Sequence, residues 1–507
     1  MKFPLKKNFS FPKFIFLKKL LLASKKLKTL LFFAVIALFV SGSFLYKAGY
    51  VEQFAPRFAT NQKEIHVAFL LEIYDKIMEN YWEKVEEEKL ANLYKLATEK
   101  VTGKTYNLDI QKDAVAPNPV TGDAALPPSS PAGDGVNKLV LEGNSLNDLK
   151  VKTDKNNERS SSTKQALEKL LNAALNNLDD AKKKEYTVNI AAAVLANLQP
   201  FGRSGLFTTK QEEVLNNTVQ NINPDKDLYK DIGIDKGASK EEVAQAVEKK
   251  AEELKKQSTP EAKKELERLA YTKDVLTDED KKGRYDTQGI EPTVFHKYYT
   301  QDIVYLRFLK YSPTTYDEFV KLVSTFDKEN GPKALILDLR TNIGGAIDFL
   351  PYFLGNFLGK NQVAFEMFQQ GEFEPFKTTT DRLPGLSKLR QTVVLIDSQT
   401  QSSAELMSAA LKKYRFAVLV GERTKGWGTV ERIFPLENQF DKSEKYSMFL
   451  VHHITIRDDG EPIEGKGVIP NISLKSNTLE KDLYDYFRYP EFTEAVKKAL
   501  QEPIRAN

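Results

Sequence analysis

The sequence predicts an α/β protein, with a core of mixed sheet and helices preceded by a transmembrane helix, a helical region and a small all-α module. Three observations support this order. The run ALILDL at residues 334–339 is apolar and bounded by turn residues, as a buried parallel strand is. Between Lys63 and Thr102, apolar residues recur every four positions, as on one helix face. The stretch Thr29–Tyr46 is uncharged.

The amino terminus predicts a membrane anchor. Residues 1–28 form a basic tail with nine lysines and no acidic residue, and residues 29–46 are 18 residues without charge. A helix crosses a bilayer with about 17–25 mostly apolar residues. Because lysines favour the cytoplasmic side, we expect a single-pass cell-membrane protein with a cytoplasmic amino end and an extracytoplasmic bulk. A cleaved signal peptide is the alternative.

The length, net charge and cysteine content of the chain exclude several classes of function. The chain has 507 residues, a net charge of +4 and no cysteine. A length of this size predicts about three folded units. The lack of cysteine excludes disulfides, thiolate metal sites and a cysteine nucleophile. No phosphate loop or metal-ligand cluster is present in the sequence, so we expect no cofactor, no metal and no nucleic-acid partner.

Two helical regions flank a linker. The first covers residues 63–102, and its recurring apolar residues are Ile65, Phe69, Ile73, Ile77 and Tyr81. Residues 103–162 contain APNPVTGDAALPPSSPAGDG, a composition that cannot build a core, and they predict a low-complexity linker. Helices are expected again within residues 163–224, where a threonine cap precedes an acidic first turn.

The segment Thr392–Val430 carries the strongest functional signal. It reads TVVLIDSQTQSSAELMSAALKKYRFAVLVGERTKGWGTV. It resembles the C-terminal processing (tail-specific) serine peptidases, whose pattern includes T-A-S-A-S-E and, later, G-E-K-T-F-G-K-G. This resemblance puts the nucleophile at Ser402 and places Trp427 at the position of the catalytic lysine. Glu431 falls where the family has a glutamine that orients that lysine.

Three further blocks follow the order of the same family: DIVYLRF at residues 302–308, ALILDLRTNIGG at 334–345 and EPIEGKGVIPNI at 461–472. The resemblance implies a peptidase core over residues 295–475, followed by a helical tail over 476–507. It also implies an oxyanion hole built by the Gly344–Gly345 turn and the amide of Ser403. Such donors stabilise a tetrahedral intermediate.

The tryptophan leaves the general base in question. A serine hydroxyl needs an adjacent base, and an indole has a donor but no acceptor. Lys425 is one substitute base. The adjacent pair His452 and His453 is another, although neighbouring strand residues face opposite sides, so only one of the pair would face the site. We therefore expect a serine endopeptidase that cleaves polypeptides through Ser402, with degenerate chemistry. The alternative is a pseudopeptidase acting as a polypeptide-binding scaffold or adaptor.

Residues 226–289 resemble a J domain. The segment begins DLYKDIGIDKGASKEEVAQAV and ends TKDVLTDEDKKGRYDTQG. Ser239 followed by Glu242 has the spacing of a capping box. The His-Pro-Asp tripeptide through which a J domain stimulates its chaperone is missing, since residues 254–260 read LKKQSTP. We call this segment the J-like module and expect it to serve either as a spacer or as a docking site for a protein partner, without that stimulation. No PDZ pattern is present.

Overall fold

The computed structural model describes residues 64–110, 162–327, 330–457 and 459–502. Residues from Glu64 onward group into one unit by their contacts. The predicted basic tail, the predicted anchor and most of the predicted linker lie outside the described residues.

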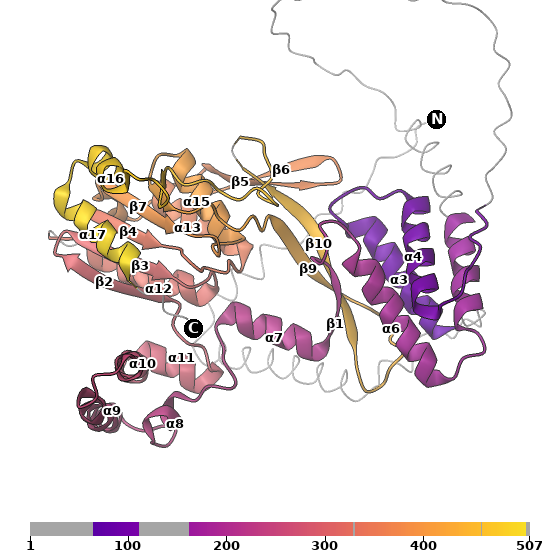
Figure 1. The fold of residues 1–507 in the computed structure, drawn as a ribbon, viewed down its shortest axis with the longest axis horizontal. Coiled ribbons are helices and arrows are strands. Elements are labelled where there is room, and N and C mark those ends of the chain that lie inside the picture. Colours follow the sequence, from indigo (N-terminus) through magenta and orange to yellow (C-terminus); the bar gives the residue numbers. More distant parts are fainter. Residues whose placement is uncertain (1–63, 111–161, 328–329, 458, 503–507) are drawn as a thin grey trace, which may run out of the picture. The chain divides into compact units, whose positions relative to one another are not determined.

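A helical region opens the described part of the chain (Figure 1). Its members are α3 (Ile65–Asn80), α4 (Glu87–Thr102), a helix over residues 162–175 and α6 (Asp180–Ala196). Of the residues predicted to share a face of the first helix, Phe69, Ile73, Ile77 and Tyr81 are buried, while Ile65 is 41% exposed. Ile65 is the first residue of α3, where few neighbours can cover it. The helices share one hydrophobic core with strand residues such as Met448 and Leu450.

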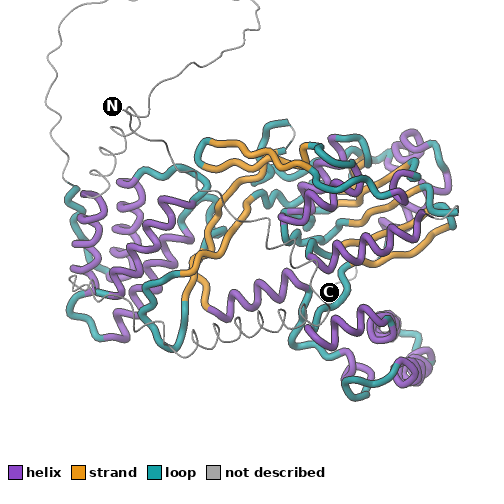
Figure 2. The backbone as a smooth tube through the Cα atoms, turned by 180° about the vertical axis from the view of Figure 1, so that it is seen from behind, coloured by secondary structure: helices purple, strands orange, loops and turns teal. Residues whose placement is uncertain are grey.

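Those strand residues belong to a five-stranded antiparallel sheet. Its members are β1 (Gly205–Thr208), β5 (Val363–Gln369), β6 (Glu372–Lys377), β9 (Thr429–Pro435) and β10 (Tyr446–Ile456). The long β10 pairs with β1 near its start, with β5 near its end and with β9 along most of its length. Figure 2 shows these strands from behind, leading from the helical region to the second sheet. The sheet therefore links the helical region to the segment that carries Trp427.

The second sheet has six strands in the order β11-β8-β7-β4-β3-β2. The strands are β2 (Val294–Thr300), β3 (Ile303–Phe308), β4 (Ala334–Asp338), β7 (Gln391–Ile396), β8 (Val418–Gly421) and β11 (Ile472–Ser473). All neighbouring pairs are parallel except β2 with β3. The apolar run at residues 334–339 supplies β4, whose residues are fully buried between β3 and β7. The sheet is mixed, as predicted.

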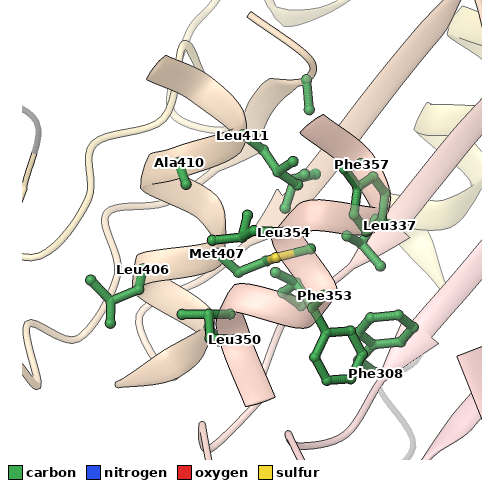
Figure 3. Packing of buried hydrophobic residues seen from close by; sticks show 14 of the residues in the cluster. Phe308, Leu337, Leu350, Phe353, Leu354, Phe357, Leu406, Met407, Ala410 and Leu411 are labelled. Carbon is green, nitrogen blue, oxygen red and sulfur yellow. The ribbon is translucent and has the colours of Figure 1, made fainter. Parts of the chain in front are cut away.

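Helices cover both faces of this sheet. One face carries α12 (Pro313–Ser324), α13 (Leu350–Leu358), α14 (Pro384–Ser387), α15 (Ser403–Lys413) and the short 3₁₀ turns at Thr325–Asp327 and Ile347–Phe349. Figure 3 shows Phe353 and Leu354 of α13 packed with Met407 and Leu411 of α15. The other face carries α16 (Leu479–Phe487) and α17 (Pro490–Gln501). This packing fixes α15, which begins next to Ser402.

The J-like module folds as four helices with its own small core. After the connecting helix α7 (Thr209–Gln220) come α8 (Leu228–Ile232), α9 (Lys240–Lys255), α10 (Pro260–Thr277) and α11 (Glu279–Gln288). Ser239 and Glu242 form a reciprocal capping box at the start of α9. The relation to J domains stays a prediction.

The two ends of the J-like module lie side by side. Ile222 and Ile290 form an antiparallel bridge on either side of it. The Asn221 carbonyl accepts the Glu291 N–H at 3.0 Å, and the Asn221 side-chain amide donates to the Glu291 carbonyl at 3.1 Å. Glu318 on α12 then accepts a hydrogen bond from Arg284 of α11 at 2.5 Å. The module is therefore held directly against the peptidase-like core.

The predicted membrane localisation needs correction. Among the described residues, no helix is long and apolar enough to span a bilayer. A span needs about 20 mostly apolar residues, whereas the 18-residue α10 carries lysine and glutamate along its length. The structure thus gives no support to single-pass anchoring. The predicted anchor itself, Thr29–Tyr46, lies outside the described residues.

Candidate functional site

Ser402 occupies a strained position at the start of α15. Its backbone angles are φ 57° and ψ −127°, a region that L residues with a side chain rarely adopt. The turn before it is fixed from both sides. Asp397 accepts the backbone N–H groups of Thr341 at 3.0 Å and Thr400 at 2.9 Å, and the Thr400 hydroxyl donates to the Leu339 carbonyl at 2.8 Å. These bonds join the ends of β7 and β4 and hold Ser402 in its conformation.

Glu405 links Ser402 to the Trp427 segment. One oxygen of its carboxylate accepts the N–H groups of Ser402 and Trp427, each at 2.8 Å. The other accepts the Thr424 hydroxyl at 2.5 Å and the Gly426 N–H at 2.7 Å. The side chain is fully buried, and burial raises its pKa while the four donors oppose that rise. The sequence analysis missed this residue, although its place three positions after Ser402 is a capping-box signal.

The predicted oxyanion residues surround Ser402. A side chain on Gly344 would begin 2.6 Å from the Ser402 Cβ, so only glycine fits this approach. The Gly344 N–H is already used, because it donates to the Asn342 side-chain oxygen at 2.8 Å. Among the hydrogen bonds of the described residues, none uses the N–H of Gly345 or Ser403. The Ser403 hydroxyl donates to the Gly345 carbonyl at 3.0 Å, which ties the two segments together. Of the three residues predicted to build an oxyanion hole, Gly345 and Ser403 therefore keep an N–H group available among the described residues, and their role stays a prediction.

Tyr311 holds the glycine turn in place. Its N–H donates to the Gly344 carbonyl at 2.8 Å, and its carbonyl accepts the Ala346 N–H at 2.8 Å. A Cβ on Gly345, whose φ is 136°, would lie 2.1 Å from the Tyr311 carbonyl oxygen. Gly345 is thus required by close backbone approach as well as by its positive φ.

Trp427 and Glu431 contact each other, as their spacing in the family pattern implies. The indole N–H of Trp427 donates to the Glu431 carboxylate at 3.1 Å, and the Thr429 hydroxyl donates to the same oxygen at 2.5 Å. Burial raises the pKa of Glu431, and the two donors and the charge of Arg203 oppose that rise. Glu431 therefore accepts a hydrogen bond from the residue at the base position. An indole in this place donates a proton and cannot take one.

Arg203 covers the indole, and nothing in the sequence analysis predicted it. The centre of its guanidinium lies 3.4 Å from the centroid of the Trp427 ring. The same guanidinium pairs with Glu464 at 3.1 Å, and Glu464 also accepts the Gly428 N–H at 2.8 Å. Arg203 comes from the segment between α6 and β1, outside every block of the family pattern. No local sequence signal could have pointed to it.

The two substitute bases lie elsewhere. The Lys425 side chain is exposed, and its ammonium nitrogen lies 5.1 Å from the Trp427 ring centroid. Its backbone N–H donates to the Thr400 carbonyl at 2.9 Å. Within the described part of the chain, neither Lys425 nor either histidine of the 452–453 pair forms a hydrogen bond with the Ser402 hydroxyl. Among the described residues, neither predicted substitute base is therefore hydrogen-bonded to Ser402.

The histidine pair departs from the expected geometry. A β-bulge between Val451 and His453 interrupts the alternation of β10. The two rings consequently lie together, with Nδ1 atoms 2.8 Å apart and centroids 4.3 Å apart, instead of on opposite faces. The His452 ring also stacks on Phe434. Burial lowers the pKa of both rings to about 4, so each is a weak base.

A lysine that the sequence analysis did not consider is buried near the glycine turn. Lys310 directly precedes Tyr311, and burial lowers its pKa to about 8. Its ammonium group donates to the Thr218 carbonyl at 2.5 Å, in the last turn of α7. The contact matches the usual preference for a cation at a helix carboxyl end. The geometry thus assigns Lys310 to holding α7. For metals, the described residues contain no group of three or more histidine, aspartate or glutamate side chains that could hold an ion.

Comparison with known proteins supports the peptidase relationship. The sequence pattern of peptidase family S41 matches residues 302–474. The chain is 30% identical over 207 residues to the carboxy-terminal processing protease CtpA of Bacillus subtilis (strain 168), which covers 40% of each chain. It is 27% identical over 184 residues to a carboxy-terminal-processing protease of Bartonella bacilliformis, covering 36% of this chain and 40% of the relative. The chain thus spans about two fifths of the length of these relatives.

Among solved structures, the photosystem II D1 C-terminal processing protease matches with a TM-score of 0.32 at 18% identity, over 36% of this chain and 49% of that one.

Proposed function

Because residues 302–474 match the pattern of peptidase family S41, we propose that this chain is a serine-type peptidase that engages polypeptide chains at Ser402 and cleaves them at a low rate. The Ser402 oxygen would attack a peptide carbonyl, forming an ester and releasing the amine with a proton. Water would then hydrolyse the ester and free the serine. The N–H groups of Gly345 and Ser403 would bind the oxygen that becomes negative in both steps.

The placement of Ser402 is the observation that carries this proposal. The residue sits in a strained conformation at a helix start, beside two backbone N–H groups that have no partner among the described residues. Strain of this kind costs about 1–3 kcal/mol and persists only where the surroundings impose it. A purely structural serine at a helix start needs no such conformation. The arrangement supports a reactive hydroxyl aimed at an oxyanion site.

The low rate follows from the missing base. The Trp427 side chain has only a donor, which it gives to Glu431, so it cannot take the proton of Ser402, and among the described residues Glu431 forms no hydrogen bond with the Ser402 hydroxyl. Lys425 is exposed and lies on the indole, and the histidines have a pKa of about 4. Since a positioned general base contributes about 10²–10⁴-fold to a rate, its loss leaves a slow reaction.

A second function, polypeptide binding without cleavage, is favoured by the same tryptophan. Arg203 and Glu431 engage the indole from its face and its edge, and Glu464 completes the cluster. Position 427 is therefore well packed around a tryptophan, which is not a base. A pseudopeptidase would keep the polypeptide site and lose the chemistry.

Reaction with a fluorophosphonate distinguishes the two functions. The purified full chain would be incubated with the probe beside Ser402→Ala, and in parallel with a mixture of unstructured proteins. Slow labelling that needs Ser402, together with slow cleavage, supports the peptidase. Absence of both, with retained binding of the unstructured proteins, favours the pseudopeptidase. Rapid cleavage by the Ser402→Ala variant would contradict both proposals.

A further inference from the structure

Arg203 reaches the site because its turn is pinned to β10. Its N–H donates to the Pro200 carbonyl at 3.2 Å, which closes the turn after α6. The next residue, Ser204, accepts the Val451 N–H through its hydroxyl at 3.1 Å. Val451 is the cross-strand partner of Glu431. The turn is therefore fixed opposite the strand residue that holds the indole N–H.

The Arg203 side chain makes three connections at once. Its planar guanidinium lies on the Trp427 ring, a contact for which arginine suits better than lysine. It is also paired with Glu464, and both side chains are largely buried, at 18% and 17% exposure. Glu464 in turn holds the N–H of Gly428, next to the indole residue. A residue between α6 and β1 thus covers the face of the Trp427 indole and, through Glu464, holds the backbone of the Trp427 segment.

We propose that Arg203 is a positioning residue of the site: it holds the Trp427 indole in the predicted lysine position beside the Ser402 turn, and the segment between α6 and β1 thereby controls access to Ser402. The effect on Ser402 rests on the proposed function, whereas the effect on Trp427 does not. Loss of the guanidinium should free the indole to swing away from Glu431. Ser402, whose N–H shares an oxygen of Glu405 with the Trp427 N–H, would then react faster with bulky reagents.

Two tryptophans make the indole directly observable. The chain contains only Trp82 and Trp427, so Trp82→Phe leaves Trp427 as the sole indole fluorophore. In that background we would measure quenching by acrylamide for three variants. Arg203→Met removes the charge and the plane while keeping a long side chain. Arg203→Lys keeps the charge and the reach to Glu464 but loses the flat stack. Arg268→Met, the matched control, removes a half-exposed arginine paired with Asp231 and Glu265 in the J-like module.

The expected result is graded. Because a cation–π contact of this kind is worth about 0.5–1 kcal/mol or more, Arg203→Met should raise the quenching constant about two- to fivefold. The quenching constant of Arg203→Lys should lie between those of Arg203→Met and the parent, and the quenching constant of Arg268→Met should equal that of the parent. The rate of fluorophosphonate labelling at Ser402 should rise in the same order.

Two results would overturn the proposal. One is an Arg203→Met protein that folds, with unchanged thermal unfolding, and shows the quenching constant of the parent. If Arg203→Met does not fold, Arg203→Lys is used instead. A quenching constant of Arg203→Lys equal to that of the parent would then also overturn the proposal. Absence of labelling at Ser402 in every variant would count against the proposed function alone, because the quenching data still test the role of Arg203.

Discussion

Ser402 and Trp427 donate their backbone N–H groups to one and the same oxygen of Glu405, each at 2.8 Å. The predicted nucleophile and the residue at the predicted base position are therefore held together by a third side chain. Since the contact uses the backbone of Trp427, it does not depend on which side chain stands there. Tryptophan stands where the family resemblance predicts a lysine, and the backbone contact that would position that lysine is present.

The first prediction concerns a variant in which a lysine base is introduced at position 427. Trp427→Lys with Glu431→Gln should raise peptide cleavage by about 10²-fold or more, the contribution of a positioned general base. Burial and the nearby Arg203 charge would lower the pKa of the new lysine, and glutamine in place of Glu431 removes the carboxylate that would raise it. Initial rates on an unstructured protein measure the effect.

The controls for this experiment are Ser402→Ala in the same background, which should abolish the gain, and Trp427→Lys alone, which should gain less. If the wild type already cleaves well, then Lys425→Met, His452→Gln, His453→Gln and Lys310→Met would identify the base. A double variant no faster than the wild type would show that the frame around position 427 is not catalytic.

The second prediction concerns Glu405. Glu405→Ala leaves the N–H groups of Ser402, Gly426 and Trp427 without their acceptor. Buried donors without partners cost about 1–3 kcal/mol each, so the free energy of unfolding should fall by roughly 3 kcal/mol or more. Urea denaturation measures it. Glu374→Ala, an exposed change on β6, should stay within about 0.5 kcal/mol of the wild type. Equal stability of the two variants would contradict the role given to Glu405.

The third prediction uses the strain at Ser402. Glycine adopts a φ of 57° without penalty, whereas alanine keeps the strain. Ser402→Gly should therefore unfold at higher urea than Ser402→Ala, with a difference of about 1 kcal/mol once the greater chain entropy of glycine is included. Both variants lack the hydroxyl, so the comparison isolates the backbone. An alanine variant as stable as the glycine variant would show that the serine is not strained.

The fourth prediction concerns acid stability. His452 and His453 have a folded pKa of about 4, below the usual value of 6.5. The folded state therefore resists protonation, and the pair's contribution to stability is present above pH about 6.5 and is lost as the pH falls towards 4. Between pH 7.5 and 5, the melting temperature of the wild type should drop more than that of His453→Gln. Parallel melting curves for the two proteins across this range would refute the assignment.

The fifth prediction concerns the J-like module. Residues 254–260 read LKKQSTP, without the His-Pro-Asp tripeptide. The full chain should therefore leave the ATP turnover of an added J-dependent chaperone unchanged, while a J protein that carries the tripeptide accelerates it in the same assay. Acceleration by this chain would mean that the module acts through another surface.

Local pattern explains why part of the site could be predicted. Residues 334–337, which begin β4, are all apolar because the strand is covered on both faces, and this composition is readable without a structure. Ser402 and Trp427 could be placed because they stand at fixed spacings within one short segment. Glu405 carried a readable signal, its capping-box spacing, but its contacts with residues 424–427 depend on a loop that folds back.

The rest depends on tertiary geometry. The contact of Arg203 with Trp427 joins segments far apart in the sequence, and neither periodicity nor a motif encodes it. The histidine rings lie together because a bulge breaks the alternation that the strand pattern assumed. The predicted membrane localisation found no support among the described helices.

The bridge between Ile222 and Ile290 has a consequence for how this chain could change over time. The 67 residues from Asn223 to Gly289 form a loop whose two ends meet, so their removal would require only a tight turn in their place. Any segment whose own termini lie close together could be grafted there without displacing the strands on either side. At that junction one inserted module could replace another while the two sheets on either side of it keep their structure.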